Sequence, residues 1–186
     1  GDDIDGDDYR VEAFRTEHGV PSLGYVFEED AKVKASRQRM EELGLEPSPK
    51  IGRVKWGETV EVDGQTIEPE DVVVEVPGRK IVYTGDTEFS GSVIEAAQDA
   101  DLLVHEATFS EELIDSRSGH TSARQAAEVA RRADVERLVL THFSRRFDDS
   151  PKTLEEEAKE VFDAVEAAED GQQFKVTPHR PEDEEG

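Results

Sequence analysis

The sequence contains no cysteine and no long apolar segment. The lack of cysteine among 186 residues excludes a disulfide scaffold, a thiolate zinc finger, an iron–sulfur cluster and a cysteine nucleophile. No apolar run approaches the roughly 20 residues that cross a membrane, and no basic-then-apolar leader opens the chain. We therefore expect a soluble, cytoplasmic protein without a membrane partner.

Basic residues are scarce compared with acidic ones. The chain has 22 Lys and Arg against 46 Asp and Glu, which gives a formal net charge of −24. Hydrophobic residues make up 34% and charged residues 37%, a composition that borders on that of disordered chains. Compact apolar runs at 81–84, 101–104 and 137–141 nevertheless predict a packed core beneath an acidic surface.

The charge has two possible explanations. Dense carboxylates suit a high-salt cytoplasm, where they hold water and cations and where salt screens their repulsion to about 3 Å at 1 M. Ordinary acidic solubility with charged tails is the alternative, and we favour the first. The same charge opposes nucleic-acid binding at low ionic strength, because its field repels phosphates. RNA binding would therefore need local arginines, metal ions or strong screening.

The chain divides into three parts. Residues 1–8 read as a flexible acidic start, 9–178 as a folded domain, and 179–186 as an acidic tail. Within 9–28 the pattern predicts two short strands around a turn, and 30–43 predicts a helix that stops at Gly44. Short strands are predicted again at 58–62 and 72–76.

Strands and helices alternate from residue 79 onward, which indicates an α/β fold. Strands are predicted at 81–85, 101–106 and 137–142, with a helix at 92–99 between the first two. Ser122 and Gln125 have the spacing of a capping box, and they precede an amphipathic helix. A last helix is predicted from Thr153, with apolar residues at helical spacing as far as Val165.

Three of these strands end in side chains that can bind metal or transfer protons, namely Asp86, His105 and His142, and His18 follows an earlier strand. Strand ends are where α/β folds collect ligands, so these residues can converge. Oxygen and imidazole donors without thiolate suit zinc, with manganese or iron as substitutes. Each residue taken alone also has a plain structural explanation, as a turn aspartate or a locally bonded histidine.

Five segments resemble ribonuclease Z, the tRNA 3′-processing endonuclease family of the metallo-β-lactamase superfamily. They are EHGVPSLGY (17–25), YTGDT (83–87), HEATF (105–109), GHTSARQAA (119–127) and LTHFSRRF (140–147). The resemblance implies that the chain is the C-terminal half of an αββα sandwich. It also implies an apolar inner sheet face that the other half would cover.

The resemblance assigns metal binding to His18, Asp86 and His142, with Asp86 bridging two zinc ions. His105 resembles the histidine that assists proton transfer to the leaving 3′-oxygen, and Glu106 resembles its positioning partner. These two are the predicted catalytic residues.

Further segments resemble the substrate-contacting part of the family's site. The loop His120, Thr121 and Ser122 resembles the family's His-Ser-Thr loop with the last two residues exchanged, so that hydroxyls stay available. Ser144 and Arg146 resemble a phosphate-binding pair, and a guanidinium suits a bidentate phosphate contact. Phe147 stands where the family usually has tyrosine.

The family's His-x-His-x-Asp-His motif is absent from this sequence. An RNA-gripping arm expected before His18 is absent as well. Two zinc ions need more ligands than His18, Asp86 and His142 supply, so the isolated chain is expected to bind zinc weakly and to cleave nothing. The complete enzyme would remove the 3′ trailer of precursor tRNA as a homodimer, with no DNA partner.

Two rival interpretations remain open at this point. One is a phosphodiesterase or other hydrolase of the same fold that acts on a small substrate. The other is a non-catalytic half-domain that a separate polypeptide completes. The sequence upstream of residue 1 would separate a truncated enzyme from such a module.

Overall fold

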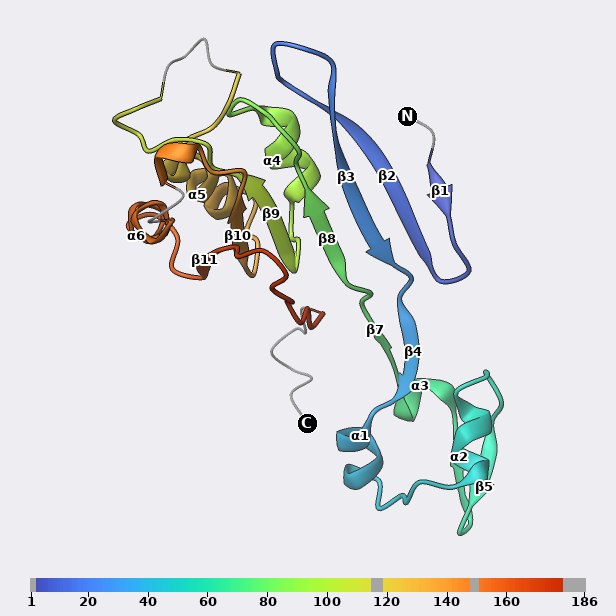
Figure 1. The fold of residues 1–186 in the computed structure, drawn as a ribbon. Coiled ribbons are helices and arrows are strands. Elements are labelled where there is room, and N and C mark those ends of the chain that lie inside the picture. The colour runs from blue at the N-terminus through green and yellow to red at the C-terminus, as the bar shows by residue number, and fades with distance from the viewer. Residues whose placement is uncertain (1–2, 115–118, 148–150, 179–186) are drawn as a thin grey trace. The chain divides into compact units, whose positions relative to one another are not determined.

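The computed structural model describes residues 3–114, 119–147 and 151–178 (Figure 1). The chain folds into two compact units. The described part of Gly1–Glu29 and Arg79–His179 forms one, here called the sheet unit, and Asp30–Gly78 forms the other, the insert unit. The expected extent of a domain over 9–178 stays a prediction.

The sheet unit contains β1 (Ile4–Asp5), β2 (Tyr9–Thr16), β3 (Ser22–Glu29), β8 (Lys80–Tyr83), β9 (Leu102–Glu106), β10 (Leu138–Thr141) and β11 (Val165–Ala167). They form a seven-stranded sheet in the order β1-β2-β3-β8-β9-β10-β11. Pairing is antiparallel from β1 to β8 and parallel from β8 to β11. The parallel strands therefore end at one edge of the sheet, as the alternating pattern predicts.

Helices α4 (Gly91–Ala97), α5 (Ala123–Arg132) and α6 (Lys152–Lys159) pack against the sheet through one hydrophobic core. Val82, Leu103 and Leu138 lie side by side in register on three neighbouring strands, and all three belong to this core. α5 approaches closely because its buried face consists mainly of alanine. Its predicted capping box is present, with reciprocal bonds between Ser122 and Gln125.

Several apolar side chains on the opposite face of the sheet remain exposed. Tyr25 on β3 pairs with Tyr83 on β8, and these two are 44% and 47% exposed. Leu23, two residues before Tyr25 on the same face, is 47% exposed. The sheet thus carries the apolar patch that the resemblance predicts, next to strands whose other face is packed by helices.

The insert unit contains β4 (Lys32–Ala35), α1 (Arg37–Glu42), α2 (Pro49–Val54), β5 (Val60–Val62), β6 (Gln65–Ile67), α3 (Pro69–Val72) and β7 (Val73–Val76). β4 and β7 form an antiparallel pair at the two ends of this segment. β5 and β6 form a hairpin whose turn, Asp63-Gly64, has positive φ at both residues. Met40, Ile51, Val54 and Ile67 contribute to a separate small core.

The helix predicted at 30–43 is wrong in its first half. Residues Lys32–Ala35 form β4, and helix α1 begins only after the cap residue Ser36. The alternation Lys-Val-Lys-Ala has period two, and Ser36 accepts the backbone N–H of Arg39, so the boundary has a local cause. The helix ends before Gly44, whose φ of +68° suits the position after a helix.

The last predicted helix is too long. α6 ends at Lys159, and Val165 begins β11 beside β10. Val161 and Phe162 still pack on the core, so their apolar spacing reflects burial beyond the helix end. The helix begins after Pro151, rather than at a Thr153 cap. At the other terminus, the segment expected to be flexible contains strand β1.

Within the described residues no helix is both long and apolar enough to cross a bilayer.

Candidate metal centre

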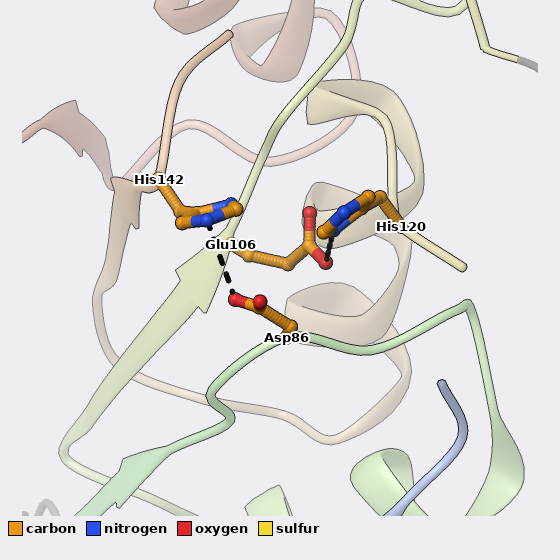
Figure 2. A group of neighbouring side chains, drawn as sticks. All are labelled: Asp86, Glu106, His120 and His142. Carbon is orange, nitrogen blue, oxygen red and sulfur yellow. Dashed lines mark hydrogen bonds and ion pairs between the residues drawn. The ribbon is translucent and has the colours of Figure 1, made fainter. Parts of the chain in front are cut away.

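Four side chains converge at the carboxyl edge of the parallel strands. They are Asp86, Glu106, His120 and His142, and one potential ligand atom from each lies within 4.8 Å of the others (Figure 2). Asp86 follows β8, Glu106 is the last residue of β9, and His142 follows β10. His120 comes from the loop before α5. Residues that are far apart in sequence therefore meet because parallel strands share an edge.

Asp86 is held through its backbone by the last residue of β2 and the first residue of β3. Its carbonyl accepts hydrogen bonds from the hydroxyls of Thr16 and Ser22, both at 3.0 Å. Gly85 precedes it at φ +60°, and a Cβ there would lie 2.8 Å from the carbonyl oxygen of Leu23. The backbone at Asp86 is thus fixed, and its carboxylate faces the other three side chains of the site.

His142 points back toward Asp86 from an unusual backbone conformation. Its φ is +57°, in the left-handed region that non-glycine residues seldom occupy. Its Nε2 lies 3.5 Å from Oδ1 of Asp86, and the two side chains are 49% and 38% exposed. An imidazole nitrogen and a carboxylate oxygen at this separation can share one cation.

Glu106 lies beneath the other three side chains, with only 1% of its own side chain exposed. Its Oε1 accepts the backbone N–H of Thr87 at 2.9 Å and faces Nδ1 of His120 at 2.8 Å. Its Oε2 accepts backbone N–H groups of Thr108 and Thr121 at 3.3 and 3.2 Å. The hydroxyl of Thr108 lies 2.7 Å from the same oxygen. A buried carboxylate is tolerated here because several donors converge on it.

His18 lies beside this group rather than within it. Its Nδ1 is 2.6 Å from the carbonyl oxygen of Gly119, and a carbonyl can only accept, so Nδ1 carries the hydrogen. The ring centroids of His18 and His120 are 5.0 Å apart, and those of His120 and His142 are 5.3 Å apart. Three histidines therefore line one edge, and the Nε2 of His18 is free to bind.

His105 is not brought to the site. It lies in register with Leu140 on the helix-covered face, because neighbouring strand residues point to opposite faces and Glu106 takes the other one. The residue is fully buried, and its Nδ1 donates to the backbone carbonyl of Glu106 at 2.7 Å. Burial lowers the pKa of His105, so the ring is neutral.

The hydroxyls expected to be available in the loop after His120 are already engaged. Thr121 donates its hydroxyl to the carbonyl of Thr87 at 2.5 Å, and Ser122 donates to Glu111 at 2.5 Å while capping α5. Both residues are buried. Their hydroxyls hold the loop in place, and the loop presents His120.

Ser144 and Arg146 follow His142 along the chain. The backbone N–H of Ser144 donates to the carbonyl of Thr108 at 3.1 Å, which fixes the chain just beyond His142. Arg146 is exposed in the short 3-10 helix η1 (Arg145–Phe147). Their predicted contact with phosphate stays a prediction.

The donor set suits a divalent metal ion. Two carboxylates and two imidazoles meet, and such oxygen and nitrogen donors fit zinc, manganese or iron better than a soft cation. Glu106 has little capacity left, because several donors already occupy its oxygens. Asp86 and His142 are therefore the best ligand pair within the group.

Thr108 is the site residue that sequence reasoning missed. It lies between Glu106 and His142 and is hydrogen-bonded to both. Thr108 lies two residues after Glu106 in the HEATF segment. Because side chains two residues apart in extended backbone share a face, this spacing could have placed Thr108 beside Glu106.

A family model described as "Beta-lactamase superfamily domain" matches residues 36–143, more than half of the chain. Among curated proteins, a ribonuclease Z of Archaeoglobus fulgidus is 44% identical over 182 residues, covering 95% of this chain and 60% of the relative. A ribonuclease Z of Haloferax volcanii is 48% identical over 176 residues, covering 91% and 56%. The chain thus spans little more than half the length of these relatives.

Two solved structures share the fold. The metallo-β-lactamase fold protein YhfI from Bacillus subtilis superposes with a TM-score of 0.60 at 20% identity, over 92% of this chain and 50% of that one. The short form of human tRNase Z superposes with a TM-score of 0.54 at 24% identity, over 94% and 46%.

The loop that carries His120 offers a first test. Gly119 and Gly171 both have left-handed backbones, at φ +75° and +81°. A Cβ on Gly119 would lie 2.8 Å from Nδ1 of His18, whereas a Cβ on Gly171 would have nothing within 4 Å. We expect both alanine variants to lose about 1–2 kcal/mol of stability from the backbone, measured by urea unfolding.

Only Gly119→Ala should also weaken divalent-cation binding, because only this change displaces His18 from the edge of the site. A chelator-competition titration with zinc measures the difference. Equal zinc affinity in the two variants would show that His18 and its loop do not contribute to the metal centre.

Proposed function

This chain belongs to the β-lactamase superfamily, and from that premise we propose that it is the C-terminal part of a metal-dependent endoribonuclease that removes the 3′ trailer of precursor tRNA. The single observation that carries the proposal is the facing pair Asp86 and His142, 3.5 Å apart just beyond the ends of β8 and β10. This pair occurs in a chain that is 44–48% identical to two ribonucleases Z. The proposal covers the complete protein, with further metal ligands supplied from outside this chain.

Zinc is the metal we propose, two ions in a complete site. Asp86 would bridge them, His142 would bind one, and His18 would bind through the Nε2 that its bond to Gly119 leaves free. When bound, zinc supplies Lewis-acid polarisation of the phosphate and a water that ionises readily. The residues of this chain fit that task because their donor atoms are oxygen and imidazole nitrogen.

Proton transfer is assigned to His120 rather than to His105. Glu106 accepts the Nδ1 hydrogen of His120 at 2.8 Å, and the ring is only partly exposed, so it is held in one orientation. In hydrolysis the water oxygen forms a bond to phosphorus, the bond from phosphorus to the 3′-oxygen of the tRNA breaks, and the water loses a proton to solvent. Protonated His120 can donate a proton from Nε2 to the departing 3′-oxygen. Glu106 orients the ring for this transfer through its contact with Nδ1.

Ser144 and Arg146 remain the proposed phosphate contacts. Arg146 is exposed within four residues of His142, and its guanidinium can bind two phosphate oxygens at once. A net charge of −24 would otherwise repel RNA, so binding depends on such local contacts under high salt. We place the protein in a high-salt cytoplasm, as a homodimer.

The insert unit supplies a second candidate surface for RNA. Between residues 32 and 55 the chain has seven basic and three acidic residues, against the strongly acidic balance of the whole. Trp56 directly follows, is 80% exposed and has the Lys55 ammonium 5.5 Å from its ring centroid. An exposed aromatic beside cations is typical of surfaces that stack bases and contact phosphates. The family resemblance implies an RNA-gripping arm before His18 that is absent from this sequence, and we propose that the insert unit contributes a further RNA contact.

The complete protein with zinc should cut a precursor tRNA to leave a 3′-hydroxyl at the end of the tRNA. Asp86→Asn should lower the cleavage rate at least 1,000-fold and reduce bound zinc, because a neutral amide is a poor bridge between cations. The matched control is Asp134→Asn, since Asp134 is exposed, has a φ of +52° and lies before β10, at the opposite sheet edge. Rates come from single-turnover gels and zinc from elemental analysis.

The 186-residue chain alone should bind zinc weakly and leave the precursor uncut in the same assay. Wild-type turnover by Asp86→Asn would remove Asp86 from the site. Cleavage of a small phosphodiester without any action on precursor tRNA would favour the small-substrate hydrolase.

Trp56→Ala should raise the KM for precursor tRNA roughly tenfold with little change in kcat, because a stacked base contributes about 1–3 kcal/mol. Turnover of a small phosphodiester without a nucleobase should stay unchanged, since such a substrate has no base to stack on Trp56. Ile4→Ala is the control, an exposed apolar residue of the sheet unit that is 62% exposed. A KM for RNA equal to the wild-type value would exclude Trp56 from the RNA contact.

A further inference from the structure

We infer that Thr108 is a positioning residue whose hydroxyl accepts the Nδ1 hydrogen of His142. The Nε2 atom of His142, which faces Asp86, is thereby left without a hydrogen and with a free lone pair. The inference extends the proposed function, because it concerns how a proposed metal ligand is prepared. It rests on hydrogen-bond directions around a single hydroxyl.

The hydroxyl of Thr108 has three close neighbours. Its Oγ1 lies 2.7 Å from Oε2 of Glu106, 2.9 Å from Nδ1 of His142 and 3.1 Å from the carbonyl oxygen of His142. The threonine itself is buried, at 7% exposure. Few other partners can reach the hydroxyl, so these three decide where its hydrogen points.

A threonine hydroxyl has one hydrogen and two lone pairs. Both neighbouring oxygens can only accept, provided that Glu106 is a carboxylate. Three backbone N–H groups point at the Glu106 oxygens, from Thr87, Thr108 and Thr121, and an N–H group cannot accept a carboxyl hydrogen. Glu106 therefore behaves as an acceptor, and the Thr108 hydrogen goes to one of the two oxygens.

Whichever oxygen receives that hydrogen, a lone pair of Thr108 Oγ1 is left facing His142. The ring must then supply the hydrogen from Nδ1. The other arrangement would turn the hydroxyl hydrogen to Nδ1 and leave its oxygen against two acceptor oxygens, which is unfavourable at 2.7 and 3.1 Å. The geometry thus selects the tautomer of His142 with hydrogen on Nδ1.

This tautomer is the one a metal ligand needs. Nε2 faces Oδ1 of Asp86 at 3.5 Å, and only a nitrogen with a free lone pair can bind a cation there. Hydrogen bonds that fix the second nitrogen of a metal-binding histidine raise metal affinity. Glu106 thereby acts on two histidines, on His120 directly and on His142 through Thr108.

Two main-chain hydrogen bonds beside Thr108 do not use its hydroxyl. The carbonyl of Thr108 accepts the N–H of Ser144 at 3.1 Å, and the N–H of Ala107 donates to the carbonyl of Thr141 at 2.8 Å. Both bonds are made by main-chain atoms, so they persist in a valine or serine variant. A structural role of the threonine can therefore be separated from its role toward His142.

The experiment compares Thr108→Val, which keeps the shape but lacks the hydroxyl, with Thr108→Ser, which keeps the hydroxyl. The complete protein is labelled with ¹⁵N histidine, freed of metal and studied at pH 8. Long-range ¹H–¹⁵N spectra report which ring nitrogen carries hydrogen, and the His142 signal is identified by its loss in His142→Asn. Zinc affinity is measured by chelator competition and stability by urea unfolding. Thr84→Val is the control, since Thr84 is a buried threonine whose hydroxyl bonds to main-chain atoms, the carbonyl of Gly85 and the N–H of Glu106, rather than to a histidine ring.

We expect hydrogen on Nδ1 of His142 in the wild type, in Thr108→Ser and in Thr84→Val. In Thr108→Val we expect a substantial share of the other tautomer and a 10- to 100-fold lower zinc affinity. The zinc affinity of Thr108→Ser should stay within about threefold of the wild-type value. Because serine keeps the hydroxyl but lacks the methyl group, this result would assign the loss in Thr108→Val to the hydroxyl rather than to packing.

Hydrogen on Nε2 of His142 in the wild type would overturn the inference, and this result does not depend on whether any variant folds. An unchanged tautomer together with unchanged zinc affinity in Thr108→Val would also overturn it. If the spectra and affinities agree with expectation but the wild type does not process precursor tRNA, the proposed function fails and the inference about Thr108 stands.

Discussion

The buried carboxylate of Glu106 is the interaction on which the candidate metal centre depends. It joins three loops, because its donors come from the segments after β8, after β9 and before α5. Burying an ionised group is costly unless donors surround it, and here backbone N–H groups supply much of that compensation. These donors fix the carboxylate in place, and the carboxylate in turn orients His120. The polar groups at the carboxyl ends of these strands thus form a single hydrogen-bonded network.

The rest of the sheet unit provides a rigid base for that network. One face of the sheet is packed by α4, α5 and α6, which places β8, β9 and β10 firmly beside one another. The other face exposes apolar residues such as Tyr25 and Tyr83. Exposed apolar patches of this kind are typical of interaction surfaces. It agrees with a chain that spans only 56–60% of two related ribonucleases Z.

Periodicity and strand ends were sufficient to predict much of this arrangement. The parallel strands, the capping box at Ser122 and the meeting of Asp86 with His142 all follow from local patterns. His105 lies away from the four converging side chains because adjacent strand residues point to opposite faces, and spacing alone does not say which face is the core. Register settles this, since His105 lies opposite the buried Leu140. The strand at β4 is not predicted because its four residues are too few to establish a period of two beside the helix that follows.

The central claim is that strand ends bring Asp86 and His142 onto a common cation. A crystal of the complete protein grown with zinc, measured at the zinc absorption edge, tests this directly. We predict an anomalous peak at a bonding distance of about 2.0–2.2 Å from both Oδ1 or Oδ2 of Asp86 and Nε2 of His142. Zinc bound elsewhere, with neither side chain within reach of it, would contradict the account.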